Sequence, residues 1–287
     1  ITLDHHWPRE VFGFAIALQN LIWGVAQPFT GMIADRFGSA KVVGVGVLIY
    51  AIGLCLITVS GTPTEFALSA GVLIGVGLSG TAFGVVYGAI SRIVPPEKSS
   101  WALGVAGAAG GLGQFVMVPG AQSLIAAIGW SQTLIAIACL FALSFLGAFA
   151  LRDKHAGATS VSQRQSLGAA LREAFAHRGF WLLNAGFLAC GFQLAFIAVH
   201  LPAYLIDKGL SAKDGVMALA IIALANVIGT YYCGYLGGLY RRTYLLAGIY
   251  FARALFMLVF VATPLTSASI YLFSACMGLL WLGTVPL

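Results

Sequence analysis

Nine long apolar segments, joined by short polar connectors, limit what this chain can fold into. Hydrophobic residues make up 60% of the 287 positions and charged residues only 8%. About 20 consecutive apolar residues are needed to cross a hydrocarbon layer roughly 30 Å thick. The apolar segments cover residues 10–34, 42–60, 67–92, 101–127, 131–151, 179–205, 213–239, 243–263 and 268–287. Because backbone groups in lipid must be hydrogen-bonded within the protein, each segment is predicted to be a helix of an all-α integral membrane protein.

The positions of the basic residues indicate a topology rather than a nucleic-acid partner, despite a net charge of +6. If the segments alternate in direction, one side carries Arg36, Lys41, Arg92, Lys98, Arg152, Lys154, Arg164, Arg172, Arg178, Arg241 and Arg242. The other side carries Arg9, Lys208 and Lys213. Because basic loops stay on the cytoplasmic side, the rich side is predicted to be cytoplasmic. We therefore expect a multi-pass protein of the inner or plasma membrane.

The longest polar stretch divides five apolar segments from four. It predicts an N-terminal helical bundle over residues 1–151, a cytoplasmic linker over 152–178 and a C-terminal bundle over 179–287. Within the linker, apolar residues recur at helical spacing at Leu167, Leu171, Ala174 and Phe175. This part is either an amphipathic helix on the inner leaflet or a solvated tether.

The two halves also resemble each other when one is shifted by about 203 residues. Gly31 then falls on Gly234, and the positions Gly75, Gly80 and Thr81 fall on Gly278, Gly283 and Thr284. One shift that serves several sites predicts two pseudo-repeated helical bundles.

A charged turn lies between the first two apolar segments. It contains Gly31, Asp35, Arg36, Gly38 and Lys41. This pattern resembles the loop between the second and third helices of major facilitator transporters. On that resemblance the nine segments correspond to the second to tenth helices of the family, so the chain is expected to be a fragment truncated at both ends. Ser39 and Ala40 stand where the family often has basic residues.

The resemblance implies that the charged turn is a conformational latch at the inner mouth of a transporter. Asp35 is then the latch residue, and Arg92 is its expected partner because it ends a segment on the same side, before Pro95 and Pro96. The alternative is that both charges only anchor helices in the headgroup region.

Arg253 is the residue of the apolar segments that costs the most free energy to insert into a membrane. It lies about 16 Å beyond Arg242 at 1.5 Å per residue, and insertion scales assign about 2.5–3.5 kcal/mol to a central Arg. It is therefore a candidate for binding an anionic substrate. The alternative is a structural Arg that snorkels or bonds backbone carbonyls.

The stretch from Gln193 to Leu210, with His200, Pro202 and Tyr204, resembles the oxalate/formate and monocarboxylate branch of the superfamily. His200 is a candidate for proton coupling, or else an interfacial anchor. Animal monocarboxylate transporters carry an acidic and a basic residue on the eighth helix, where this chain has Asn226 and Thr230. Further substrate-binding candidates are Gln114, Gln193 and Tyr87.

These features together predict a secondary active transporter of a small organic solute, most simply a monocarboxylate or related organic anion. It is expected to act as a monomer, with protons as the candidate coupling ion. The alternatives are a transporter-like membrane receptor and a drug or metabolite efflux carrier, although Gly110-Gly111-Leu112-Gly113 departs from the Gly-Pro-x-x-Gly-Gly pattern of drug antiporters. An enzyme is not expected, because the nine acidic residues lie near segment ends without a metal-ligand motif. No cofactor or metal is expected, and the five cysteines are interpreted as packing residues.

Overall fold

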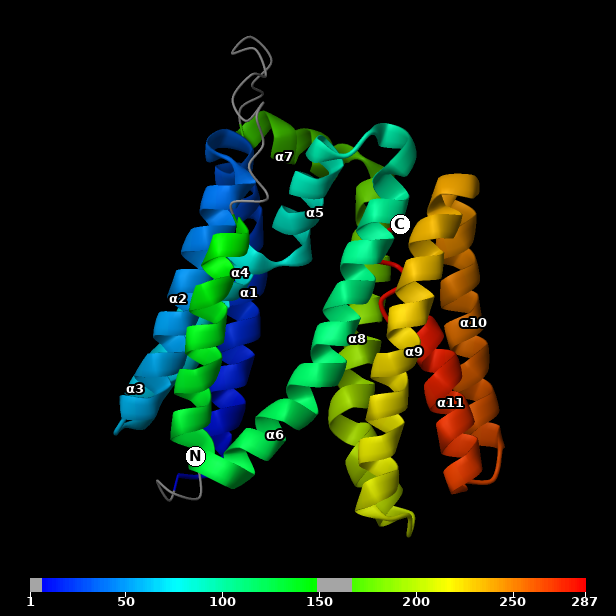
Figure 1. Ribbon diagram of the computed structural model, residues 1–287. Helices are drawn as coiled ribbons and strands as arrows, with labels where there is room; N and C mark the ends of the chain where they lie inside the picture. Colours follow the sequence, from blue (N-terminus) through cyan, green and yellow to red (C-terminus); the bar gives the residue numbers. More distant parts are fainter. Residues whose placement is uncertain (1–6, 149–166) are drawn as a thin grey trace. The chain divides into compact units, whose positions relative to one another are not determined.

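The computed structural model describes residues 7–148 and 167–287, and all the regular elements in these ranges are helices (Figure 1). Packing divides the chain into two compact units. The first contains Ile1–Ser99 and Met117–Thr159, and the second contains Ser100–Val116 and Ser160–Leu287. The predicted domain boundaries at residues 151 and 178 stay a prediction, since residues 149–166 lie outside the described part.

The first unit is built from one long helix pair and a shorter, broken third span. Its helices are α1 (Arg9–Phe37), α2 (Ser39–Val59), α3 (Pro63–Phe66), the π-helical stretch η1 (Ala67–Leu73), α4 (Ile74–Thr81) and α5 (Phe83–Ile93). Thr62 and Glu65 form a capping box that starts α3, because each side chain accepts a hydrogen bond from the other residue's amide. Phe66, Ala70 and Ile74 then pack into a core shared with α1 and α2.

The second unit contains α7 (Leu167–Ala176), α8 (Arg178–Asp207), α9 (Ala212–Leu239), α10 (Arg242–Ala262) and α11 (Ser267–Leu279). Its core joins α8, α9 and α11 through Leu205, Ala218, Ile222 and Ile270. Helix α7 agrees with the amphipathic helix expected in the second part of the linker.

Helix α6 (Pro96–Ala148) covers two of the predicted segments. It is interrupted at Gly129, whose φ of +79° is outside the helical region and favours glycine. Within the described residues seven helices are long and apolar enough to cross a membrane. Eight of the nine predicted segments map onto these seven helices, because α6 contains two of them, and the ninth segment maps onto the shorter, 13-residue α11.

The predicted segment 67–92 is not one continuous α-helix. Ala82 has an extended ψ of 158° and separates α4 from α5. Gly80 and Gly84 flank the break and lower the helix propensity of this stretch. The Ala82 carbonyl accepts from the Val85 and Val86 amides, so it starts α5 as its N-cap residue.

The predicted helix over residues 268–287 is wrong beyond Leu279, where α11 ends. In Figure 1 the chain leaves α11 as a short non-helical stretch (red) next to α9. We name residues 280–287 the terminal segment. Gly283 weakens a helix here, and Pro286 has no amide to donate to the Leu282 carbonyl.

The pseudo-repeat is confirmed by matching helix contacts inside the two units. A Cβ added to Gly75 would lie 2.9 Å from the Gln19 carbonyl oxygen and 3.0 Å from Ile22 Cβ. One added to Gly278 would lie 2.7 Å from the Ile222 carbonyl oxygen and 2.6 Å from Ala225 Cβ. The second set of three residues equals the first set displaced by the shift found in the sequence. Small residues at these positions let the helix backbones approach closely.

Candidate functional site

Asp35, Ser39 and Arg92 meet at the junction of α1, α2 and α5 in the first unit. Arg92 Nη1 donates to Asp35 Oδ1 at 3.0 Å, and Arg92 Nη2 donates to Ser39 Oγ at 2.5 Å. The carboxylate is 73% exposed and the arginine side chain 37% exposed. The structure thus brings together the two residues expected to form the latch and adds Ser39, which is fully buried.

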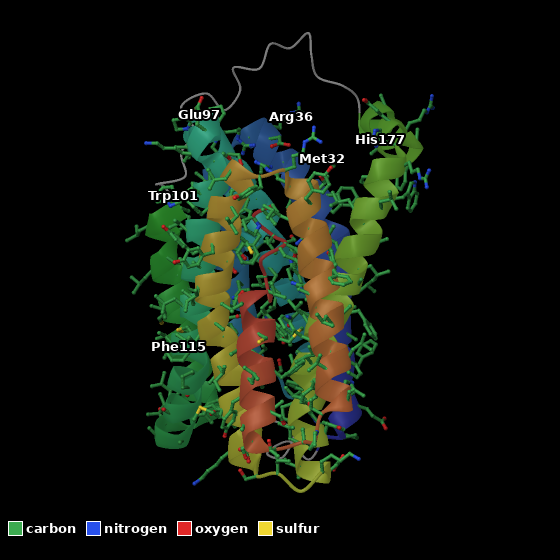
Figure 2. The ribbon with its side chains drawn as sticks, turned by 90° about the vertical axis from the view of Figure 1, so that its right-hand side faces the viewer. Met32, Arg36, Glu97, Trp101, Phe115 and His177 are labelled. Carbon is green, nitrogen blue, oxygen red and sulfur yellow. The ribbon has the colours of Figure 1, made fainter. Side chains whose placement is uncertain are left out.

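The other residues of the charged turn shape the junction rather than join the ion pair. Gly38 has a φ of +95°, and its amide donates to the Ala34 carbonyl at 2.9 Å, so it ends α1 and allows α2 to begin at once. Arg36 and Lys41 are exposed, and Figure 2 shows Arg36 at the same end of α1 as Met32. Gly31 faces open space.

Arg253 on α10 is 2% exposed, and its guanidinium is fully engaged within the second unit. Nε donates to the Leu280 carbonyl at 3.1 Å, and Nη2 donates to the same carbonyl and to that of Trp281 at 2.6 Å. Nη1 donates to Cys190 Sγ at 3.1 Å. The guanidinium also lies over the Tyr250 ring, 5.6 Å from its centroid.

Within the described residues, the hydrogen-bond acceptors of Arg253 include no carboxylate. Two are backbone carbonyls and one is a thiol. Four hydrogen bonds serve the five N–H donors of the guanidinium. A buried guanidinium without a carboxylate keeps its full positive charge. The arrangement is therefore able to attract an anion, and a planar carboxylate fits its fork of donors.

Asn226 on α9 is fully buried and faces the same terminal segment. Its Oδ1 accepts from the Leu282 amide at 3.1 Å and from Thr230 Oγ1 at 2.9 Å. Among the described residues its Nδ2 has no acceptor. This nitrogen lies close to Gly111 of α6, where an added Cβ would be 2.8 Å away. Arg253 and Asn226 thus bind three consecutive residues of one non-helical segment.

The remaining substrate candidates are not part of this cluster. Gln114 on α6 is exposed and Gln193 on α8 is half-buried. Tyr87 belongs to the first unit, is 8% exposed, and its hydroxyl has no partner. His200 is exposed on α8, with its ring 4.9 Å from that of Phe196.

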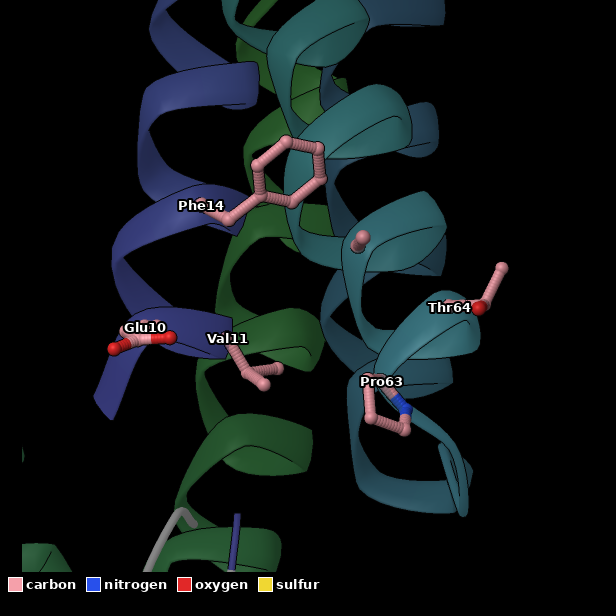
Figure 3. Close-up of a pocket in the computed structure, with 6 residues that line it drawn as sticks. Glu10, Val11, Phe14, Pro63 and Thr64 are labelled. Carbon is pink, nitrogen blue, oxygen red and sulfur yellow. The ribbon is translucent and has the colours of Figure 1, made fainter. Parts of the chain in front are cut away.

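His200 lines an apolar cavity of about 570 Å³ in the second unit, together with Tyr204 and Asp207. A cavity of about 370 Å³ in the first unit lies between the start of α1 and α3 (Figure 3). Glu10, Val11 and Phe14 line one side of it. This second cavity contains none of the predicted site residues.

Sequence reasoning missed two polar contacts of this cluster. Cys190 was interpreted as a packing residue, but it accepts from Arg253 and lies 3.5 Å from Thr284 Oγ1. Its single position in an apolar segment gave no signal of that role. Thr284 was found only as a member of the repeat.

A family model of the Major Facilitator Superfamily matches residues 1–287. The chain therefore belongs to this superfamily of membrane transporters, as its loop pattern and repeated helical bundles indicated.

Among curated relatives, the chain is 23% identical to the uncharacterized MFS-type transporter YcxA of Bacillus subtilis, covering 98% of this chain and 70% of the relative. It is 26% identical to the probable sulfoacetate transporter SauU of Cupriavidus necator, covering 82% of this chain and 60% of the relative. It is 25% identical to monocarboxylate transporter 13 of Rattus norvegicus, covering 79% of this chain and 51% of the relative. The chain thus spans between half and 70% of the length of these relatives, and the resemblance to the monocarboxylate branch is confirmed.

Among solved structures, the chain is similar to the E. coli fucose:proton symporter FucP, with a TM-score of 0.69, 17% identity, and 96% of this chain and 79% of that chain covered. A second FucP structure, in the outward conformation, gives a TM-score of 0.76. At this identity the likeness shows the fold alone.

Proposed function

We propose that the protein is a secondary active transporter of a small organic anion, in the simplest case a monocarboxylate. The transporter carries the anion by alternating access of its two helical bundles. The observation that carries this proposal is the buried positive charge of Arg253, whose acceptors in the described part of the chain include no carboxylate. An intramembrane Arg is expensive to insert, so its retention favours a role in binding.

The named substrates of two relatives support an anionic cargo. Sulfoacetate and monocarboxylates, after which SauU and monocarboxylate transporter 13 are named, both carry a carboxylate. A carboxylate accepts two parallel hydrogen bonds from a guanidinium, which suits Arg253 better than a neutral sugar does. Asn226 and Tyr87 offer neutral donors and stay substrate-binding candidates, as do Gln114 and Gln193.

The pair Asp35–Arg92 fits a latch that holds the first unit in one conformation. The bonded atoms lie 3.0 Å apart, and both side chains are partly exposed, so the pair can break and reform at small cost in free energy. Gly31, Arg36, Gly38 and Lys41 complete the loop, with the basic residues on the cytoplasmic side of a multi-pass protein of the inner or plasma membrane.

His200 is the proposed residue for coupling to protons. It is exposed and lines the same apolar cavity as Asp207, and an imidazole changes charge near neutral pH. In this proposal the protein is a symporter that moves the anion with a proton.

Uptake of radiolabelled pyruvate and sulfoacetate into proteoliposomes tests the proposal, with the intact protein carrying this sequence and with an imposed proton gradient. Uptake stimulated by the gradient supports an anion symporter. If the folded protein binds a carboxylate but never transports it, the protein is a receptor and the proposal is wrong.

A further inference from the structure

The terminal segment fills the hydrogen-bonding positions of two buried side chains. The carbonyls of Leu280 and Trp281 accept hydrogen bonds from the Arg253 guanidinium. The amide of Leu282 donates a hydrogen bond to Asn226 Oδ1. These are three consecutive residues directly after the end of α11. The side-chain contacts therefore replace helix hydrogen bonds at this position.

A continuous helix would use the same backbone groups internally. The Leu280 and Trp281 carbonyls would accept from the Thr284 and Val285 amides, and the Leu282 amide would donate to the Gly278 carbonyl. Instead, the Trp281 amide donates to Gly278 at 3.0 Å and the Val285 amide donates to Leu282 at 3.0 Å, in tighter turns of three residues. Arg253 and Asn226 thus compete directly with completion of α11.

The stretch that corresponds to residues 280–284 in the first unit is helical. Leu280 and Thr284 correspond to Gly77 and Thr81 on the shift of the repeat, and α4 is helical through Thr81. Thr81 Oγ1 donates to the Gly77 carbonyl at 3.2 Å, where the equivalent Leu280 carbonyl accepts from Arg253 instead.

The residue that corresponds to Arg253 is Tyr50, which carries no guanidinium. Its backbone packs against Gly77, where an added Cβ would lie 2.8 Å from the Tyr50 nitrogen. Helix α4 therefore continues to Thr81 before its break at Ala82, whereas α11 already ends at Leu279, the position that corresponds to Val76.

We propose that Arg253 binds the carboxylate of the transported anion, and that the Leu280 and Trp281 carbonyls occupy the guanidinium while the site is empty. The inference rests on the proposed function. It adds which groups bind the Arg253 guanidinium before and after the anion arrives. A carboxylate offers Arg253 two charged acceptors in place of neutral carbonyls. Anion binding releases the carbonyls, and residues 280–284 then extend α11 as a helix.

Asn226 supplies an independent sign of a second state. Its Nδ2 is a fully buried donor without an acceptor, and such an orphan costs free energy in this conformation. When the Leu282 amide turns to the Gly278 carbonyl, Oδ1 keeps its bond from Thr230. The Asn226 side-chain amide is then free to reorient, so that its Nδ2 reaches an acceptor.

Hydrogen exchange of the backbone amides tests this switch in the intact protein, reconstituted in nanodiscs. The readout is the exchange rate of the Thr284 and Val285 amides, measured by mass spectrometry without ligand and with saturating sodium pyruvate or sodium sulfoacetate; sodium chloride is the salt control. We expect at least one carboxylate, but not chloride, to slow exchange about tenfold or more, because helix completion protects both amides.

Variants at Arg253 separate the switch from general stabilisation. Arg253→Gln removes the guanidinium, so both amides are expected to be protected without any carboxylate. Arg253→Lys keeps the charge without the fork and should lose the response to carboxylate. Arg241→Gln, the same change at the exposed start of α10, should behave as the wild-type protein does.

The outcomes distinguish the switch from the transport proposal. Uptake of a carboxylate with no change in exchange by that same carboxylate would overturn the switch and leave transport standing. A carboxylate-dependent change without uptake would support the binding site and overturn transport. If Arg253→Gln does not fold, the comparison of the wild-type protein with and without carboxylate still decides the inference.

Discussion

Asp35 Oδ1 and Arg92 Nη1 lie 3.0 Å apart, although 57 residues separate them in the sequence. The contact joins the end of α1 to the end of α5. Because both side chains remain partly exposed, an ion pair of this kind stabilises a fold by about 1 kcal/mol or less. Its proposed role is to hold one conformation of the transporter for part of each cycle.

Asp35→Asn tests that role. The substitution keeps the shape but removes the charge, so we expect a slower maximal uptake rate, a KM within about twofold of wild type, and a small change in melting temperature. Glu10→Gln, at the exposed start of the same helix, is the matched control. A partial recovery in the charge-reversed double variant Asp35→Arg with Arg92→Asp would support the pair, whereas an unchanged rate in Asp35→Asn would remove it from the mechanism.

Gly278→Ala tests the close packing of α9 and α11. The added methyl would lie 2.6 Å from Ala225 Cβ and 2.7 Å from the Ile222 carbonyl oxygen, so we expect a destabilisation of about 1–3 kcal/mol. Gly248→Ala on α10 meets nothing within 4 Å and is expected to be neutral or slightly stabilising. Thermal unfolding in detergent measures both variants, and equal melting temperatures would refute the close approach.

Asn226→Ala tests whether that amide holds the terminal segment. It leaves the Leu282 amide and the Thr230 hydroxyl without their shared acceptor, which costs about 1–3 kcal/mol. Asn184→Ala is the control, since Asn184 is exposed and donates to the Phe180 carbonyl within its own helix. Loss of stability in both variants alike would show that the effect is not specific to the segment.

His200→Gln tests proton coupling. We expect the variant to transport at equal pH on both sides but to lose the stimulation given by an inward proton gradient, because glutamine does not titrate. Uptake is measured with and without the gradient in the same vesicle preparation. Full stimulation in the variant would assign His200 to an interfacial role.

The helical class and the repeat were readable from the sequence, because apolar length and glycine spacing are local properties that bilayer and helix packing demand directly. The ends of the elements were less readable. The break at Ala82 follows from weak helix formers on both sides, which a hydropathy pattern does not register. The residues directly after α11 hydrogen-bond Arg253 and Asn226, which are distant in sequence.

The site was only partly predictable for the same reason. A charge deep in an apolar segment has a high free energy of membrane insertion, so the sequence alone indicates a role for Arg253. Its partners are backbone carbonyls of Leu280 and Trp281 and the thiol of Cys190, and neither group has a sequence signature. Asn226 was singled out by its alignment with the charged positions of monocarboxylate transporters, but its bond to Leu282 needed the fold.

Uptake of labelled pyruvate and sulfoacetate by Arg253→Gln, beside wild type and Arg241→Gln in proteoliposomes of matched protein content, tests the central claim most directly. The account predicts that wild type and Arg241→Gln take up at least one of these anions, and that Arg253→Gln loses about tenfold or more of that rate while remaining inserted and folded. Equal uptake by all three proteins would contradict the account, because the buried guanidinium would then have only a structural role.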